Sequence, residues 1–520
     1  MSINKVLTGY EMVEIDKIAV KRGIKALDLM EKAGQKVANI AKKELEDFGK
    51  KNVLAVCGKG NNGGDGFVAS SILHSKGLNV ITYYIGEPEE LREPSKTSFK
   101  KVKLSGLTIK KIEKDLISFK KDLKNCDFVI DAIFGTGLKR PVKGIYLDII
   151  NLINNANKHV LSIDIPSGIN GDTGEVFKVA IKANTTVTLQ TYKFGLLNYP
   201  GASYVGDIKC VDIGIPQGLV DKYCKIFFID DEWVLKRLPK RKAYAHKGDA
   251  GKLFVIAGSP GFTGAAYMCS MSALIGGAGV VTIAIPEGLN TVMETKLTEV
   301  MTLPLPQTKD GTLAISALPI IMDAIKGFDC IAIGPGISLN EETSVLVKSL
   351  VKDLRIPIVI DADALTILSE NIEILKDSKA PIIITPHPGE LSRLLHITKV
   401  NLKDRLELNR EISKNIGKIS VLKGARTLVS NPEGETFINL TGSPAMATAG
   451  SGDILVGLIA SLIVQGVGPY DAAIMGTYLH GLAGDMAVEE IGQRSLIATD
   501  IMNKIPKTFL RIEGTFPFTE

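Results

Sequence analysis

Residues 52–86, NVLAVCGKGNNGGDGFVASSILHSKGLNVITYYIG, decide the fold of the first half of the chain. Two apolar runs rich in β-branched residues, at 52–58 and 78–86, flank a glycine-rich turn and a segment expected to be helical. Both runs are continuously apolar rather than alternating, which is typical of strands covered on both faces. The stretch therefore predicts a βαβ unit in a parallel sheet.

Similar apolar runs extend this pattern in both directions, and residues 10–48 are predicted to be helical. In the first half the further runs are CDFVIDAIFG (126–135), KHVLSIDIP (158–166) and TTVTLQ (185–190). A second series consists of KLFVIAGSPG (252–261), VVTIAIP (280–286), DCIAIGPG (329–336), IPIVIDADAL (356–365), APIIITPHPGE (380–390) and ISVLKGARTLVS (419–430). The sequence thus predicts an α/β protein with two three-layer αβα domains.

The composition changes between these two series. Residues 215–247 are rich in charge and include a basic run at 236–242, which we expect to be a solvated linker face. A boundary near residues 216–230 divides the chain into expected domains 1–220 and 221–520. A length of 520 residues agrees with more than one domain.

Charge and composition exclude several classes of protein. The 62 Lys and Arg residues nearly balance the 57 Asp and Glu residues. The net charge of +5 is too small to indicate the strongly basic surface that binds nucleic acid. A hydrophobic content of 45% excludes wholesale disorder. The six cysteines are scattered and form no CxxC pair, which is typical of a reducing compartment and predicts a cytoplasmic protein.

Two uncharged stretches, at 253–286 and 454–470, raise the question of a membrane span. The first is interrupted by glycine-rich turns and the second is short for a span. Both are therefore predicted to be buried elements of the α/β core, and no membrane partner is expected.

Glycine accounts for 51 residues, and this excess predicts tight turns and close approach of backbone to a ligand. One cluster is GKGNNGGDG (58–66), where backbone N–H groups and the positive end of a helix can bind an anion. It matches neither GxGxxG nor a P-loop. Asn61, Asn62 and Asp65 add oxygens that can hold a cation or a ribose. The alternative is a tight turn that needs glycines with positive φ.

Two more glycine-containing segments lie at strand ends, DAIFGTGLKRPVKG (131–144) and SIDIPSGINGDTG (162–174). Because ligands bind beyond the carboxyl ends of parallel strands, we expect these segments to meet the first cluster at one crevice. There Asn62, Asp131 and Ser167 offer hard oxygen ligands suited to a monovalent or alkaline-earth cation.

An acid–base pair is predicted at the same crevice. Asp164 lies at the end of one strand, and Lys193 lies just after the next. If the two side chains meet, they can exchange a proton with a ligand.

In the second half, SPAMATAGSGDILVGLIASLI (443–463) is the most informative segment. Gly450, Ser451 and Gly452 form a small-residue turn, and Asp453 follows in the first turn of an apolar helix. The N–H groups of the turn can stabilise a phosphoryl group in transfer, and Asp453 can take a proton from the attacking hydroxyl. The alternative is that Asp453 only caps the helix.

Further strand-end segments accompany this turn and are expected at the same crevice. His387, between two prolines, is a candidate substrate contact, with a purely structural histidine as the alternative. The segments are KGARTLV (423–429), TPHPGE (385–390), DADAL (361–365), IGPG (333–336) and AGSPGFTGAA (257–266).

The first half resembles the NAD(P)H-hydrate epimerases over residues 8–215, through NNGGDG, DAIFGTG, DIPSG and the segment around Lys193. The resemblance implies a Rossmann-like domain that interconverts the R and S epimers of hydrated NAD(P)H, with potassium bound by Asn62, Asp131 and Ser167. The residues that it implies as contacts of the hydrate are Asp164, Asn61, Asn62, Gly63, Gly64, Asp65, Gly135, Thr136, Gly137, Leu138, Lys139, Arg140 and Pro141. Related domains in other proteins only bind, so a non-catalytic nucleotide- or protein-binding module is the alternative.

The second half resembles the ribokinase-like fold, and within it the NAD(P)H-hydrate dehydratases, over residues 230–510. KGDAG, GSPGFTGAA, IGPG, DADAL, TPHPGE and MATAGSGD occur in that family's order. The resemblance implies phosphorylation of the hydrate at its C6 hydroxyl and elimination of phosphate, with Asp453 as base. Implied hydrate contacts are Ala265, Gly336, His387 and Asp453, and implied nucleotide contacts are Lys423, Gly424, Ala425, Arg426, Thr427, Leu428, Gly450, Ser451 and Gly452. Family members often have Asn where this chain has Ser443.

These resemblances predict a bifunctional enzyme that epimerises NADHX and NADPHX and then dehydrates the S epimer. ADP is the expected co-substrate, as in bacterial and archaeal relatives, with Mg²⁺ beside it; eukaryotic relatives use ATP. The alternative is a ribokinase-like small-molecule kinase with a non-catalytic first half. Glycine- and alanine-rich segments such as SMSALIGGAGVV (270–281) favour a homo-oligomer.

Overall fold

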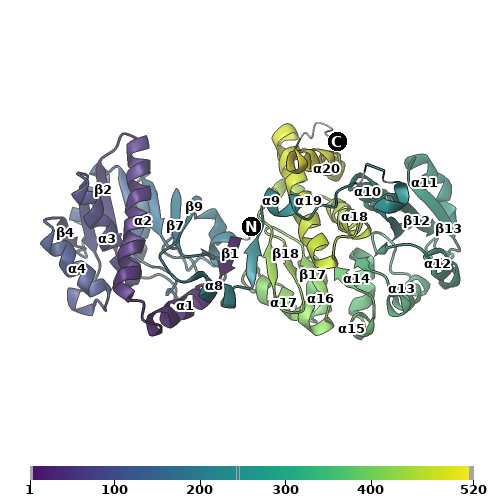
Figure 1. The fold of residues 1–520 in the computed structure, drawn as a ribbon, viewed down its shortest axis with the longest axis horizontal. Helices are drawn as coiled ribbons and strands as arrows, with labels where there is room; N and C mark the ends of the chain where they lie inside the picture. Colours follow the sequence, from purple (N-terminus) through teal and green to yellow (C-terminus); the bar gives the residue numbers. More distant parts are fainter. Residues whose placement is uncertain (1–3, 242, 245, 515–520) are drawn as a thin grey trace. The chain divides into compact units, whose positions relative to one another are not determined.

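The structure is a computed structural model and describes residues 4–241, 243–244 and 246–514. The chain divides into two compact units, one of residues 5–226 and one of residue 4 together with residues 227 onward (Figure 1). Each unit has its own hydrophobic core, as expected of a domain.

The N-terminal unit is built on a seven-stranded sheet in which all neighbouring strands are parallel. The order is β4-β3-β2-β5-β6-β7-β9, and the βαβ unit predicted over residues 52–86 is confirmed as β2, α3 and β3. A separate short pair, β1 and β8, is also parallel. The strands are β1 (Asn4–Leu7), β2 (Asn52–Cys57), β3 (Asn79–Tyr84), β4 (Thr108–Lys111), β5 (Phe128–Ala132), β6 (His159–Ile163), β7 (Thr185–Leu189), β8 (Tyr192–Lys193) and β9 (Asp207–Val211).

Helices cover both faces of this sheet. Along β2, Val53 and Ala55 pack into the core beneath α2 and α3, whereas Leu54 and Val56 pack into a second core beneath α5 and α6. The predicted three layers are therefore present. The helices are α1 (Gly9–Lys21), α2 (Ala26–Asp47), α3 (Asn61–Ser75), α4 (Ser95–Leu104), α5 (Ile117–Asn125), α6 (Ile145–Asn155), α7 (Phe194–Leu197) and α8 (Gln217–Tyr223).

The prediction of helix over residues 10–48 is confirmed except at residues 22–25, where the chain turns between two helices. Helix α1 begins after Thr8, which forms a capping box with Glu11, and ends at Lys21. Gly23 then takes a φ of +96°, a conformation that glycine adopts freely and that ends a right-handed helix. The chain turns there before α2 starts, and this turn lets α1 contribute separately to the site described below.

The C-terminal unit contains a larger sheet in the order β13-β12-β11-β14-β15-β16-β17-β18-β19. Its strands are parallel as far as β17, and β17, β18 and β19 form antiparallel hairpins. The sequence did not predict the reversal of the chain between Leu422 and Leu428 within residues 419–430. The strands are β10 (Ile226–Phe228), β11 (Lys252–Ile256), β12 (Val280–Pro286), β13 (Met301–Leu305), β14 (Cys330–Ile333), β15 (Ile358–Ile360), β16 (Ile382–Ile384), β17 (Ile419–Leu422), β18 (Leu428–Ser430) and β19 (Thr436–Ile438).

Helices α10, α18, α19 and α20 pack on one face of this sheet, and Figure 1 shows α13, α14 and α17 on the other. This unit therefore also has three layers. The helices are α9 (Asp231–Leu235), α10 (Thr263–Ile275), α11 (Asn290–Lys296), α12 (Leu318–Ala324), α13 (Glu341–Asp353), α14 (Ala362–Ser369), α15 (Glu373–Asp377), α16 (Pro388–Leu394), α17 (Arg405–Ile416), α18 (Ser451–Val464), α19 (Pro469–Ile491) and α20 (Ala498–Glu513).

The uncharged stretches form core elements, as predicted. Residues 253–286 form most of β11, all of α10 and β12, and residues 454–470 form most of α18 and the start of α19. A Cβ on Gly457 would lie 2.1 Å from the Cys269 carbonyl, so small residues bring α10 and α18 together within one chain. None of the described helices has the length and apolar character needed to cross a membrane.

Candidate active sites

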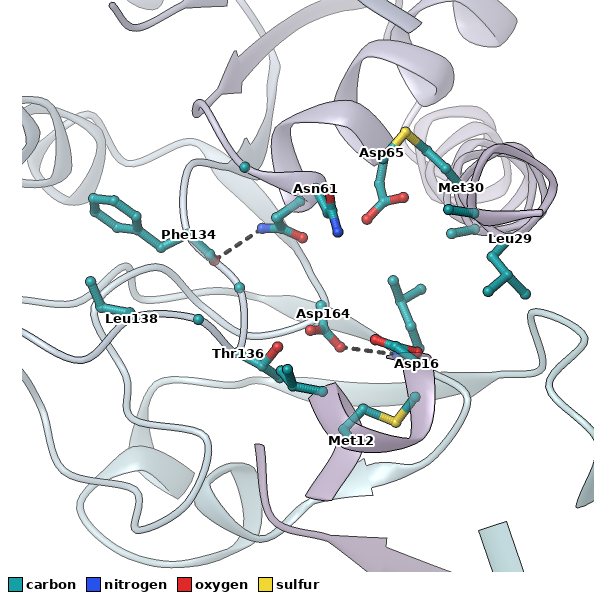
Figure 2. Close-up of a pocket in the computed structure, with 18 of the residues that line it drawn as sticks. Met12, Asp16, Leu29, Met30, Asn61, Asp65, Phe134, Thr136, Leu138 and Asp164 are labelled. Carbon is teal, nitrogen blue, oxygen red and sulfur yellow. Dashed lines mark hydrogen bonds between the residues drawn. The ribbon is translucent and has the colours of Figure 1, made fainter. Parts of the chain in front are cut away.

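The N-terminal unit contains a cavity of about 1040 Å³ beyond the carboxyl ends of β2, β5 and β6 (Figure 2). Its wall combines α1, the first turns of α2 and α3, and the loop after β5. Of the predicted site residues, the structure brings together Asn61, Asn62, Asp65, Gly135, Thr136, Gly137, Leu138, Lys139, Arg140, Asp164 and Lys193. Gly63, Gly64 and Pro141, all within the described residues, do not line the cavity.

The glycines of residues 58–66 permit close packing rather than unusual backbone angles. A Cβ on Gly58 would lie 1.9 Å from the Ile133 carbonyl oxygen, and one on Gly63 would lie 2.0 Å from the Gly58 carbonyl oxygen. None of the glycines in this described segment has a positive φ, so the alternative of a positive-φ turn was wrong. The helix already starts at Asn61, and its first turn therefore faces the cavity.

Asp164 and Lys193 form a buried ion pair in the wall of this cavity. Lys193 Nζ donates to Asp164 Oδ1 at 2.6 Å, and also to Thr188 Oγ1 at 3.1 Å and to the Leu189 carbonyl at 2.5 Å. The Lys193 side chain is 1% exposed and that of Asp164 is 11% exposed. A residue just after β6 and a residue of β8 are thus held in contact at one point of the site.

Two further carboxyl groups surround this pair. Burial raises the pKa of Asp16 to about 7, with Lys193 lowering it and Asp164 raising it. Burial also raises the pKa of Asp65 well above its usual range, and the charges of Asp164 and Asp16 add to the effect. One ion pair and two carboxyl groups that favour the protonated state therefore share the cavity, an arrangement suited to proton transfer.

The three residues predicted to bind a cation are linked through the loop after β5. Asp131 is fully buried and accepts from Ser167 Oγ at 2.5 Å and from Ser162 Oγ at 2.8 Å. The amide of Phe134 donates to Ser167 Oγ, and Asn62 Nδ2 donates to the Phe134 carbonyl at 3.0 Å. Within the described part of the chain, Asn62 Oδ1 is buried and finds no hydrogen-bond partner. This orphaned oxygen beside hydroxyl, carbonyl and carboxylate oxygens fits a hard cation such as potassium.

In the C-terminal unit, Asp453 lies in the first turn of α18. The residue that caps this helix is Gly450, with a φ of +90°, so the alternative that Asp453 is only a cap was wrong. Burial raises the pKa of Asp453 to about 7; Asp361 and Asp363 raise it further and Lys423 lowers it. A carboxyl with this pKa beside a helix N-terminus can act as a base near neutral pH.

A second buried ion pair lies next to this carboxyl. Lys423 Nζ pairs with Asp361 Oδ1 and lies 3.9 Å from Glu390 Oε2. Burial disfavours the charge on Lys423, but Asp361 and Glu390 outweigh it and raise the pKa of Lys423. A Cβ on Gly452 would lie 3.3 Å from Lys423 Nζ, so the pair directly adjoins the small-residue turn.

The predicted nucleotide segment, Lys423 to Leu428, forms the turn of the β17–β18 hairpin. Gly424 and Arg426 both have positive φ values, which a tight reversal requires. The buried guanidinium of Arg405 donates to the carbonyls of Ala425 and Leu422, and these hydrogen bonds hold the turn in place. Lys423 is therefore held against the turn that precedes α18.

His387 caps helix α16 and uses one ring nitrogen for this purpose. Its Nδ1 accepts from the amides of Gly389 at 2.9 Å and Glu390 at 3.4 Å. Burial and the charge of Lys423 lower its pKa, so it is neutral at physiological pH. The structural alternative thus accounts for Nδ1, while Nε2, on a half-exposed side chain, lies 3.4 Å from Glu390 Oε1.

Of the remaining predicted residues, Gly336 and Ala265 lie next to each other. A Cβ on Gly336 would lie 3.4 Å from the Ala265 Cβ, and the Gly336 carbonyl accepts from Ser259 Oγ at 2.7 Å. Ser451, in the small-residue turn, lies with its hydroxyl 3.3 Å from His480 Nε2 of α19. Burial lowers the pKa of His480 to about 4, which keeps this histidine neutral beside the turn.

Comparison with known proteins identifies both units. The family model described as NAD(P)H-hydrate dehydratase matches residues 253–507, and that described as YjeF-related protein N-terminus matches residues 26–195. The bifunctional NAD(P)H-hydrate repair enzyme Nnr of Moorella thermoacetica is 39% identical and covers 98% of this chain and 97% of its own. The chain belongs to this family. The enzyme of the same name from Thermofilum pendens is 38% identical over the same shares of both chains.

A solved structure is also similar to the second half of the chain described here. It is an ADP/ATP-dependent NAD(P)H-hydrate dehydratase from Bacillus subtilis co-crystallised with ATP/Mg²⁺, with 28% identity and a TM-score of 0.46. It covers 55% of this chain and 98% of that chain.

Sequence reasoning did not single out Asp16, Asp361 or Glu390 as site residues. Asp361 and Glu390 lie in strand-end segments that were expected at the crevice, and their acidity was the available signal. Burial raises the pKa of Glu390 to about 7, with Lys423 lowering it and Asp361 raising it. Asp16 lies on an amphipathic helix, where a polar residue gives no such signal.

Proposed function

We propose that this chain is a bifunctional enzyme that repairs hydrated NAD(P)H. The N-terminal unit interconverts R and S NAD(P)HX, and the C-terminal unit dehydrates the S epimer with ADP, giving AMP and phosphate. The observation that carries this proposal is the alignment of bifunctional repair enzymes over nearly the whole chain, together with a separate acid–base cluster in each unit. We assign epimerisation to residues 1–220 and dehydration to residues 221–520.

For epimerisation, the hydrate occupies the N-terminal cavity. The segments Asn61–Asp65 and Gly135–Pro141 hold it, and Asp164 exchanges a proton with the group at C6. Lys193 keeps Asp164 in place and balances its charge, since all three donors of its ammonium group are used within 3.1 Å. The unpartnered Oδ1 of Asn62, together with oxygens of Asp131 and Ser167, would hold potassium, which would supply positive charge beside the segment that binds the hydrate.

For dehydration, Asp453 takes the proton of the C6 hydroxyl as that oxygen attacks the terminal phosphoryl group of the nucleotide. The N–H groups of Gly450, Ser451 and Gly452 face the charge that develops, and Lys423 adds a positive charge beside them. The hairpin Lys423–Leu428 binds the nucleotide, and Ala265, Gly336 and His387 contact the hydrate. Mg²⁺ would be held by the acidic side chains near Lys423 and would neutralise phosphate charge. Phosphate then leaves C6 with the bonding electron pair, C5 loses a proton to solvent, and the double bond of the nicotinamide ring is restored.

The proposal includes ADP rather than ATP, a cytoplasmic location and a homo-oligomer. The small residues of α10 serve a contact within the chain, so an oligomer has to be tested by its mass in solution. Both nucleotides are to be compared in the same assay, at equal concentration.

The test uses purified full-length protein, a mixture of R and S NADHX, and ADP or ATP. We expect the near-ultraviolet absorbance of NADH to return for both epimers with ADP. Recovery of the S fraction alone would contradict the epimerase assignment. A phosphorylated product that accumulates without return of absorbance would instead support a small-molecule kinase.

A further inference from the structure

Helix α1 places a carboxyl group in the wall of the N-terminal cavity, outside the segment matched by the family model. Met12, Ile15 and Ala19 anchor the helix in the core, and Asp16 lies on the edge of this buried stripe. In Figure 2 the carboxyl groups of Asp16, Asp164 and Asp65 border one open space. Asp16 therefore reaches the region where the hydrate would bind.

The charged groups around Asp16 come from three other elements. Lys193 of β8 and Asp164 after β6 act on it most strongly, and Asp65 of α3 is the next neighbour. Further cations in the cavity wall are Lys17 and Lys21 on α1 itself, Lys59 before α3, and Lys139 and Arg140 after β5. Asp16 thus shares the cavity wall with the negative charge of Asp164 and several positive groups.

Asp16 makes no structural hydrogen bond that would explain its position. The three donors of the Lys193 ammonium group are taken by Asp164, Thr188 and Leu189. Among the described residues no donor bonds to the Asp16 carboxyl, and only burial and neighbouring charges act on it. Burial in turn gives it a pKa of about 7, so both protonation states are populated near neutral pH.

We propose that Asp16 is a further catalytic residue of the epimerase site and shares one mobile proton with Asp164. This inference rests on the proposed epimerase function. Asp16 protonates the hydroxyl at C6, the C6–O bond breaks with its electron pair on oxygen, and water leaves. The lone pair of the adjacent ring nitrogen stabilises the cation at C6. Water then adds to the other face and gives its proton to Asp164, and exchange with solvent returns a proton to Asp16.

The reactive state holds one proton on the two carboxyl groups in either direction of the reaction. The rate of epimer exchange is therefore expected to fall as the pH rises through about 7, where that proton is lost. A residue that only packed in the wall would not produce this limb of the pH profile.

The test measures R-to-S exchange in full-length protein without nucleotide, with the uncatalysed exchange subtracted. We expect Asp16→Asn to slow exchange by about 10²-fold and to remove the limb near pH 7, and Asp16→Glu to restore both in part. Glu14→Gln, on the same helix but outside the cavity, is the matched control. Calorimetric unfolding of the full chain reports on the fold of the N-terminal unit, because dehydration takes place in the other unit.

Several results would overturn or redirect the inference. Exchange by Asp16→Asn within about twofold of wild type, with the same pH profile, would overturn it. If Asp16→Asn also unfolds the N-terminal unit, the Glu variant decides: its pH limb moves if Asp16 carries the proton and stays in place if it does not. A wild-type enzyme that fails to accelerate exchange would contradict the proposed function instead.

Discussion

The acid–base clusters of the two units have the same components in different settings. Each contains a buried Lys–Asp pair, Lys193 with Asp164 and Lys423 with Asp361. Each also has a neighbouring carboxyl whose pKa burial raises to about 7. In the C-terminal cluster this carboxyl, Asp453, itself lies in the first turn of a helix that follows a small-residue turn, whereas Asp16 lies in the interior of α1. The common part is suited to moving protons, and the added turn is what phosphoryl transfer requires.

The surroundings of the two carboxyl groups with raised pKa also give them opposite roles, one as a base and one as an acid. Asp453, next to the turn, serves the reaction as a base and has to be ionised. Asp16, beside an ion pair in a cavity, serves as an acid and has to be protonated. The same pKa therefore predicts opposite pH dependences for the two activities. Substitution of single residues can test each of these dependences separately.

The largest effect is expected from Asp453→Asn. Loss of the base should reduce dehydration of S-NADHX by about 10²–10⁴-fold and leave epimer exchange unchanged. The measurement is return of NADH absorbance with ADP, with exposed Asp323→Asn as control. A loss of less than about threefold would remove Asp453 from the mechanism.

The second effect concerns stability and compares the two ion pairs. Asp164→Asn leaves the Lys193 ammonium buried and unpaired, which should cost about 3–5 kcal/mol of unfolding free energy. Asp361→Asn should cost less, because Glu390 remains 3.9 Å from Lys423 Nζ. Calorimetry of the full chain measures both. Asp164→Asn/Lys193→Met is expected to recover part of the loss, and equal costs for the two single variants would argue against the comparison.

The third effect is the pH dependence of dehydration. Because the base must be ionised, kcat should fall as the pH drops below about 7. The charge of Asp361 raises the pKa of Asp453, so Asp361→Asn should move this limb to lower pH. A kcat profile at saturating nucleotide tests the sign, and a limb that rises as the pH falls would show Asp453 acting as an acid.

The smallest effect is expected at Ser443. Its hydroxyl accepts from the Ala445 amide at 3.3 Å and caps a short turn before Gly450. Asn caps equally well, so Ser443→Asn should change the KM for ADP by less than about twofold. A larger change would indicate that this position contacts the nucleotide.

Much of the fold followed from the sequence because continuous apolar runs are a strong signal for buried parallel strands. Asp164 and Lys193 could be paired in advance because each follows a strand, and the sheet brings strand ends together. The reversal within residues 423–427 was missed, since the apolar residues on both sides of it read as one run. Asp16 was missed for a different reason: its setting depends on where α1 packs, which no local pattern encodes.

The central claim, that each unit performs its own step, is tested by mixing two full-length variants. Asp453→Asn lacks the second step and Asp164→Asn/Lys193→Met lacks the first. With R and S NADHX and ADP, we expect no return of NADH from the former alone and return of only the S fraction from the latter. A mixture of the two proteins should convert both epimers. The account would be contradicted if the mixture recovered no more NADH than Asp164→Asn/Lys193→Met alone. It would also be contradicted if that variant alone converted both epimers.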